Sequence, residues 1–169
     1  MKMTDLFLAE LQREAVGTRR ALERVPDGRS DWKPHEKSMS LGRLATLVAS
    51  MSSWIAIMVN DDDLDFNPPG GSKIARKELG TSYELVEAHE GNVAKAREAL
   101  ANTTDEHLMT AFRFLVAGRV VAEQPRHIML RDAVFNHLAH HRGQLTVYLR
   151  LNNALVPEIY GPTADERSF

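Results

Sequence analysis

Residues Asn136 to Glu166, which read NHLAHHRGQLTVYLRLNNALVPEIYGPTADE, decide the fold more than any other stretch of the chain. Together with the residues just before them, they predict an amphipathic helix, because apolar residues recur at steps of about three and four. The apolar positions of this stripe are Leu130, Val134, Leu138, Leu145 and Tyr148. His141 fills the step between Leu138 and Leu145, so we expect it to face the protein core.

A second histidine, His137, lies four residues before His141. About 40° separates two such side chains around a helix axis, so their imidazole rings can converge on one point. This spacing is typical of helical metal ligands and makes His137 and His141 candidates for that role. His140 points toward the edge of the stripe, where we expect it to support the pair. The alternative is that both histidines are buried polar residues hydrogen-bonded to neighbouring helices.

The residues around this pair resemble the last helix and tail of the DinB-like (damage-inducible, YfiT-like) family of helical-bundle proteins. Those that carry the resemblance are Asn136, His137, His141, Arg142, Gly143, Gln144 and Leu145, with YLRL and PEIYGPTADE behind them. Upstream, SLGRLATLVASMSSWIAIMV resembles the second helix of that family, DDDLDFNPPGG the loop after it, and QPRHIMLRDAVFNH the lead into the fourth helix. The resemblance implies an all-α four-helix bundle with a long crossover connection, formed by one domain over residues 1–169.

The resemblance also implies a function and partners. It implies a divalent metal, often nickel or zinc, held by three histidines, of which two match His137 and His141. Where the family has an assigned activity, it is metal-assisted activation of a small thiol for transfer or isomerisation on small electrophiles, in a stress-response setting. His140 or Arg142 would orient groups nearby. A homodimer built from helix faces is implied as well, and the second helix, with Trp54 and Met58, offers a face for a partner.

One position departs from the family pattern. The third histidine of the family lies on the second helix, and the matching residue here is Leu47. Leucine cannot ligate a metal, so the sequence predicts a weak site that is empty or partly occupied. His89 lies on a core-facing stripe of the third helix and is a candidate replacement ligand. Weaker candidates are Glu90, Ser50 and Met51.

This departure leaves two classes of function open. The first is a metal-dependent small-molecule thiol transferase or isomerase with an incomplete histidine site. The second is a non-catalytic, metal-free dimeric bundle that acts as a binding or structural protein. Because Leu138 follows His137, the H-E-x-x-H pattern of a zinc protease is missing, and peptidase chemistry is disfavoured.

Composition narrows the class of protein further. The chain has 169 residues, 43% of them hydrophobic, which suits one domain with a substantial core. It has no cysteine, and therefore no disulfide or cysteine nucleophile. With 21 basic and 23 acidic residues it has no strong field to attract nucleic acid. The amino terminus shows no export signal and the longest uncharged stretch is short for a membrane span, so we expect a cytoplasmic protein without nucleic-acid or membrane partners.

Helical periodicity appears four times, and no segment shows sustained strand alternation. We expect helices from Thr4 to Arg24, from Ser38 or Ser40 to about Asn60, from Lys77 or Thr81 to Ala101, and from Arg126 to Asn152. Thr81 with Glu84 predicts a capping box, and Thr103 with Glu106 predicts a second one at the start of a short helix. We expect an irregular segment from Ala111 to Pro125. Trp54 should pack in the core or at a subunit interface, Trp32 should plug one end of the bundle, and the tail should fold back over a helix end.

Overall fold

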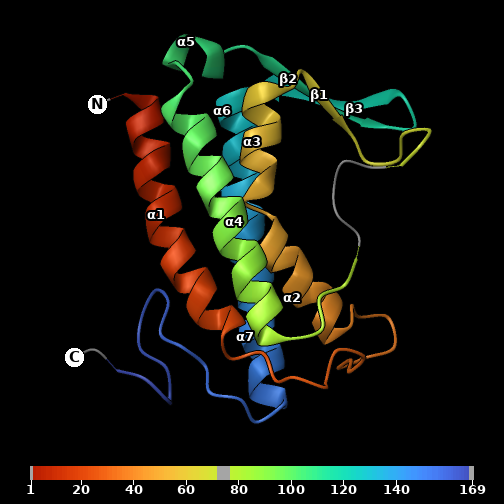
Figure 1. Cartoon of the computed structure of the whole chain (residues 1–169), viewed down its shortest axis with the longest axis vertical. Coiled ribbons are helices and arrows are strands. Elements are labelled where there is room, and N and C mark those ends of the chain that lie inside the picture. Colours follow the sequence, from red (N-terminus) through yellow and green to blue (C-terminus); the bar gives the residue numbers. More distant parts are fainter. Residues whose placement is uncertain (1, 72–76, 168–169) are drawn as a thin grey trace.

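The computed structural model describes residues 2–71 and 77–167. A bundle of helices carries a small sheet at one end (Figure 1). The helices are α1 (Met3–Leu22), α2 (Leu41–Ser50), α3 (Ser53–Asn60), α4 (Ser82–Ala101), α5 (Asp105–Leu108), α6 (Arg126–Met129), the π-helical segment η1 (Leu130–Asn136) and α7 (His137–Leu151). The strands are β1 (Asp63–Asp65), β2 (Ala111–Val116) and β3 (Arg119–Pro125).

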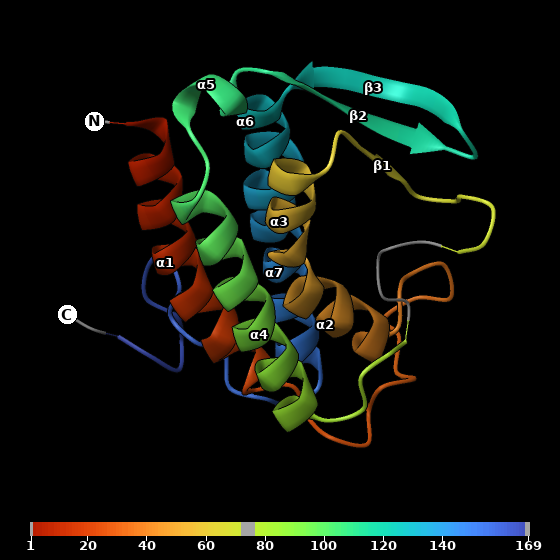
Figure 2. The same cartoon turned by 45° about the horizontal axis from the view of Figure 1, so that its top comes forward.

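The first and third predicted helices form close to their expected places, as α1 and α4, and lie side by side in both views (Figures 1 and 2). The predicted capping box is present at the start of α4, where Thr81 and Glu84 each accept from the other's backbone N–H. At the start of α1, the backbone N–H groups of Met3 and Thr4 donate to Asp105 of α5, at 2.8 and 3.0 Å. A carboxylate distant in sequence thus satisfies donors that a helix leaves open at its start.

The second predicted helix is broken into two. Ser40 caps α2 as expected, accepting from the backbone N–H of Arg43, but α2 and α3 are bent by 45° at the break. Near the break, Ser50 and Ser53 donate to the Thr46 and Ser50 carbonyls, each at 2.7 Å. Serine hydroxyls bonded back to helix carbonyls favour bending. Within the described residues no single helix is long and apolar enough to cross a membrane. Only α2 and α3 added together across this bend reach the necessary length and composition.

The expectation of an all-α fold needs correction, because the segment from Ala111 to Pro125 is a β-hairpin. Strands β2 and β3 pair antiparallel, and β1 pairs parallel with β2 (Figure 2). The turn between β2 and β3 uses Ala117 and Gly118, with φ angles of 50° and 78°, a conformation that suits the twist of a two-residue hairpin. Phe112 and Phe114 enter the core and alternate with exposed neighbours.

The remaining predicted helices form with altered details. The expected helix from Arg126 to Asn152 runs through α6, η1 and α7, and its seven-residue stretch Leu130–Asn136 is π-helical. The short helix α5 starts one residue later than predicted. Its cap is Thr104, whose hydroxyl accepts from the backbone N–H of His107, so the proposed capping role of Thr103 is wrong.

Two hydrophobic clusters fill the bundle, and Leu47 packs against both of them. Trp54 is buried in the first cluster, as predicted. Trp32 packs against the second cluster and meets the Tyr148 ring edge-on at 5.4 Å, which agrees with a plug at one end of the bundle.

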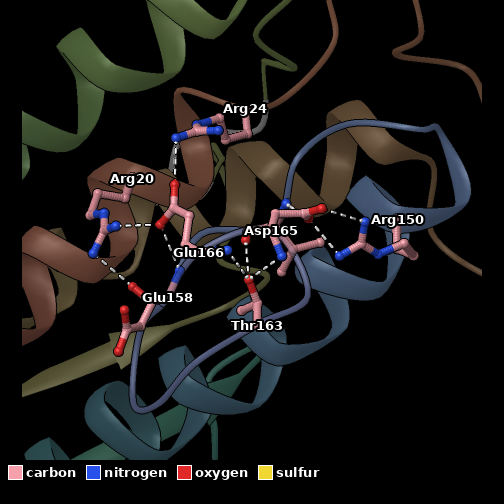
Figure 3. Close-up of polar contacts among 8 residues, drawn as sticks. Arg20, Arg24, Arg150, Glu158, Thr163, Asp165 and Glu166 are labelled. Atoms are coloured by element: carbon pink, nitrogen blue, oxygen red, sulfur yellow. Dashed lines mark hydrogen bonds and ion pairs between the residues drawn. The ribbon is translucent and has the colours of Figure 1, made fainter. Parts of the chain in front are cut away.

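The C-terminal tail folds back against α1, as expected (Figure 3). The Glu166 carboxylate pairs with both Arg20 and Arg24, and Asp165 pairs with Arg150 at 2.6 Å. The tail is therefore held to both α1 and α7 by charged side chains.

Candidate metal centre

The two candidate ligands converge at the start of α7. His137 is the first residue of this helix, directly after η1, and His141 lies one turn later. Their ring centroids are 4.6 Å apart, and their Nε2 atoms face each other at 2.8 Å. Both side chains are half-buried, and the Trp54 ring of α3 borders His137 with ring centroids 5.8 Å apart. The helical spacing therefore brings both Nε2 atoms to one point, as the sequence predicts.

A hydrogen bond on the outer ring nitrogen of His141 indicates which of its nitrogens carries a proton. Nδ1 of His141 donates to the Gln144 side-chain oxygen at 2.8 Å, which leaves a lone pair on its Nε2. Nε2–H of His137 can therefore donate to Nε2 of His141 across the 2.8 Å that separates them. Transfer of the His137 proton from Nε2 to Nδ1 would leave two lone pairs directed at one point, which is the form in which the pair can ligate a metal.

The electrostatics of the pair disfavour a charged imidazolium at either ring near neutral pH. Burial lowers the pKa of His137 below its usual 6.5, and the nearby His141 lowers it further. Burial also lowers the pKa of His141, more than its hydrogen bond to Gln144 raises it. The two imidazoles are thus neutral at pH 7, which is the form that ligates a metal.

The distance between the two Nε2 atoms is close to the shortest that two ligands of one metal ion can have. Two zinc–nitrogen bonds of about 2.05 Å that meet at a right angle place their nitrogens about 2.9 Å apart, and wider angles place them farther apart. The observed 2.8 Å is close to this lower limit. The donor pair therefore fits two neighbouring positions of a divalent metal after a small opening of the rings.

A third protein ligand is missing from the arrangement. Leu47, which the family resemblance matches to the third histidine, packs against both hydrophobic clusters. In the part of the chain that the structure describes, no three histidine, aspartate or glutamate side chains gather into a group that could hold a metal ion. Catalytic zinc sites usually have three protein ligands, so the present pair is one ligand short of that pattern.

The suggested replacement ligands have other partners. Nε2 of His89 donates to the Ala15 carbonyl of α1 at 3.1 Å, so this side chain belongs to the contact between α1 and α4. Glu90 pairs with Arg19 at 3.3 Å, and the Ser50 hydroxyl bonds back to Thr46. Met51 is buried in the second cluster. Within the described residues, neither His89 nor Glu90 joins the histidine pair in a group that could hold a metal ion.

The two supporting residues named from the sequence have different places. His140 is exposed, and its Nε2 lies 3.0 Å from the Gln144 amide nitrogen, so Gln144 links it to His141. Arg142 is buried and contacts α1 instead, with 2.6 Å between its guanidinium and the Glu14 carboxylate. The expectation that Arg142 orients groups at the metal is therefore wrong. Consecutive helix residues point about 100° apart, which explains why it faces away.

Sequence reasoning missed two groups beside the pair. Gln144 fixes the protonated nitrogen of His141, and its position three residues later on the same helix face was the available signal. The indole N–H of Trp54 is buried without a hydrogen-bond partner among the described residues. Its ring lies beside His137, so the indole covers part of the pair.

Comparisons with known proteins agree with this fold. The chain is 27% identical over 164 residues to the uncharacterized protein YrdA of Bacillus subtilis (strain 168), a match that spans 96% of this chain and 90% of that protein. A DinB-like protein from Bacillus cereus ATCC 10987 has the same fold, with a TM-score of 0.71 at 22% identity over 91% of this chain and 95% of the other. The DinB-like protein YjoA from Bacillus subtilis has a TM-score of 0.67 at 20% identity, over 90% of this chain and 95% of the other. The sequence model of the DinB family matches residues 1–167, and the chain therefore belongs to the DinB family.

Proposed function

We propose that this DinB-family protein binds a divalent cation, nickel or zinc, through Nε2 of His137 and His141, and that the bound ion supports chemistry on a small thiol. One observation carries the proposal: the Nε2 atoms of two half-buried imidazoles converge at 2.8 Å, close to the separation of two neighbouring nitrogen ligands of one metal ion.

The chemistry follows from the donor set. A divalent ion held by two neutral imidazoles favours the thiolate form of a thiol that it coordinates, which makes a nucleophile at neutral pH. Residues beside the pair would orient the imidazoles and exclude water. Gln144 keeps the His141 imidazole oriented, and the Trp54 ring shields one side of His137 from water.

Metal binding is the first test. Untagged protein is dialysed against chelator, titrated with nickel or zinc, and analysed for metal per chain. We expect micromolar or weaker binding of one ion, lost in His137→Ala. His35→Ala is the matched control, because His35 is an exposed histidine in the connector before α2. Equal metal content in wild type and His137→Ala would refute the proposed ligands.

Restoring the missing histidine tests the third position. Leu47→His should raise metal affinity at least tenfold if α2 presents residue 47 to the pair. The conservative control is Leu47→Met, since it keeps an apolar side chain in the same cluster. An unchanged affinity in Leu47→His would show that the third ligand position lies elsewhere.

Thiol chemistry is tested once binding is established. The metal-loaded protein is incubated with a small monothiol and 1-chloro-2,4-dinitrobenzene, where sulfur replaces chloride and the released proton and chloride enter solvent. We expect turnover that depends on metal and falls in both His137→Ala and His141→Ala. Turnover that survives both substitutions would separate the activity from this site.

A second candidate function rests on Leu47. Its place between the two hydrophobic clusters suits a bundle that has given up metal chemistry and acts as a metal-free binding or structural protein. Absence of nickel and zinc binding at millimolar ion would favour this candidate. The metal-free pair would then keep a neutral N–H···N hydrogen bond between the two Nε2 atoms, which ¹⁵N NMR of the two imidazoles would detect.

The homodimer stays a prediction, with its surface revised. Trp54 and Met58, which were expected to offer a face to a partner, are 6% and 0% exposed inside a single chain. A dimer must therefore use another surface. Light scattering after size exclusion measures the mass directly, and a monomer at high protein concentration would contradict the prediction.

A further inference from the structure

The side chain of Gln144 lies between two histidines of α7. Its Nε2 is 3.0 Å from Nε2 of His140, and its Oε1 is 2.8 Å from Nδ1 of His141. The other ring nitrogen of His141 lies 2.8 Å from Nε2 of His137. These four side chains therefore form one continuous chain of hydrogen bonds, which leads from the half-buried histidine pair to an exposed ring at the surface.

The chemistry of the amide gives this chain a direction. An amide nitrogen only donates and an amide oxygen only accepts. Nε2 of His140 must therefore accept from the Gln144 N–H, and Nδ1–H of His141 must donate to the Gln144 oxygen. A neutral imidazole carries one proton, so Nε2 of His141 has a lone pair and accepts from Nε2–H of His137. Each donor thus points along the chain toward His140.

For neutral rings, the opposite direction is the other arrangement that satisfies these contacts. Turning the Gln144 amide by half a turn would present its nitrogen to Nδ1 of His141 and its oxygen to Nε2 of His140. Each ring would keep one proton but carry it on the other nitrogen, after exchange with water. His141 would then have a proton on Nε2 and could not ligate a metal through that atom.

His140 supplies the acceptor at the exposed end of the chain. Within the described residues its side chain has one hydrogen bond, the one with Gln144. Because the ring is exposed, its own proton can lie on Nδ1, where water accepts it, while Nε2 accepts from the amide. Without an acceptor at this position, the Gln144 amide loses one of the two contacts that define its orientation.

We propose that His140 is a positioning residue for the metal site. By accepting from the Gln144 N–H, it holds the amide oxygen toward Nδ1 of His141 and keeps Nε2 of His141 unprotonated and available to a cation. The effect on metal binding rests on the proposed function of the pair, whereas the effect on the position of the His141 proton does not. Loss of partners that orient metal-ligating histidines typically lowers metal affinity about 10–100-fold.

The test compares metal-free proteins labelled with ¹⁵N-histidine at pH 8, where an imidazole with the ordinary pKa of about 6.5 is neutral. Long-range ¹H–¹⁵N spectra show which ring nitrogen carries the proton. In the wild-type protein we expect Nδ1–H on His141 and Nε2–H on His137. His140→Lys replaces the acceptor by a group that only donates, so the Gln144 oxygen should turn toward it, and both protons should move to the other ring nitrogens.

Gln144→Glu provides the matched control background. It keeps the length of the side chain but offers an acceptor at each carboxylate oxygen. In this background His140→Lys brings the same charge to the same place, yet the carboxylate still accepts from Nδ1–H of His141. The protons should therefore stay where they are in the wild-type protein. Both substituted positions are exposed, so we expect these variants to fold.

Nickel titration with metal analysis gives the second measurement. His140→Lys should bind nickel about tenfold more weakly than the wild-type protein. The double variant, His140→Lys with Gln144→Glu, should bind nickel at least as tightly as the wild-type protein, because the carboxylate again orients His141.

Several results would overturn the role of His140. They are an Nε2–H on His141 in the wild-type protein, unchanged protons in His140→Lys, or equal nickel affinity in His140→Lys and the wild-type protein. Movement of the protons in the Gln144→Glu background would also overturn it, because the lysine charge would then act without the amide. Protons that move as expected, in a protein that binds no nickel, would refute the proposed function instead.

Discussion

The buried contact between Glu14 and Arg142 allows a sharp test of what joins α1 to α7. Glu14 is 7% and Arg142 is 1% exposed. The guanidinium donates to the Glu14 carboxylate at 2.6 Å, to the Glu14 carbonyl at 3.0 Å and to the Thr18 hydroxyl at 2.8 Å, and it also contacts the Tyr160 hydroxyl. Glu14→Gln keeps the size of the side chain and one acceptor, but removes the negative charge that balances the buried cation.

The magnitude follows from this burial. Removing one member of a buried ion pair costs about 3–5 kcal/mol, because the other charge stays buried without compensation. Since glutamine still offers an acceptor oxygen, we expect the low end, a loss of about 3 kcal/mol in the free energy of unfolding. For a protein of this size, about 2–4 °C accompanies each kcal/mol, so Tm should fall by about 6–12 °C. The matched control is Glu23→Gln, which removes a 3.0 Å pair with Arg19 that is half exposed, and should cost at most about 1 kcal/mol.

Urea unfolding followed by circular dichroism at pH 7 measures both variants under the same conditions. A loss in Glu14→Gln of less than about 1 kcal/mol, or one equal to that of Glu23→Gln, would refute the reasoning. It would mean that the apolar contacts between α1 and α7 hold these helices together without the buried charges.

Three further predictions concern the histidines, the sheet and the tail. Burial lowers the pKa values of His89, His137 and His141 from the usual 6.5, so the unfolded chain binds more protons than the folded chain as pH falls below neutrality. The free energy of unfolding should therefore decline as pH falls from 7 to 5.5. A flat profile in urea titrations would contradict this. Phe112→Ala removes a fully buried ring of β2 and should cost about 3–5 kcal/mol in urea unfolding, whereas Val121→Ala on exposed β3 should cost less than 1 kcal/mol. In Gly17→Ala, the added Cβ would lie 2.9 Å from Cγ2 of Ile159. In a double-mutant cycle, the change that Gly17→Ala makes in the free energy of unfolding should be at least about 1 kcal/mol more favourable in an Ile159→Ala background. Additive effects would exclude the clash.

The helices were predictable because each carries its own local signals. Periodicity located α1 and α4, and the Thr81–Glu84 box marked the start of α4. The bend between α2 and α3 was not predicted, because Ser50 and Ser53 could equally have faced solvent. The hairpin was missed although Phe112 and Phe114 alternate with exposed residues and a Gly follows Ala117. Its first strand, β2, pairs with β1, which precedes α4 in the chain, and no local pattern reveals this contact.

Part of the candidate site could likewise be predicted from local sequence, and part could not. Convergence of His137 and His141 follows from helical geometry alone, and so does the separation of Arg142 from them. Burial of His89 was also predictable from its stripe. Its partner was not, because the choice between the histidine pair and the Ala15 carbonyl depends on which helix packs against α4 and at what height.

The π-helical segment η1 is a place where the chain length of this protein can change by one residue. A π turn holds one residue more than an α turn between the same two ends, and such turns are often found at functional sites. Deleting a single residue within Leu130–Asn136 could therefore restore an ordinary α-helix while α6 and α7 keep their places. We therefore expect the segment to accept a one-residue deletion in the middle of a helix, where a length change usually disrupts packing, directly before His137.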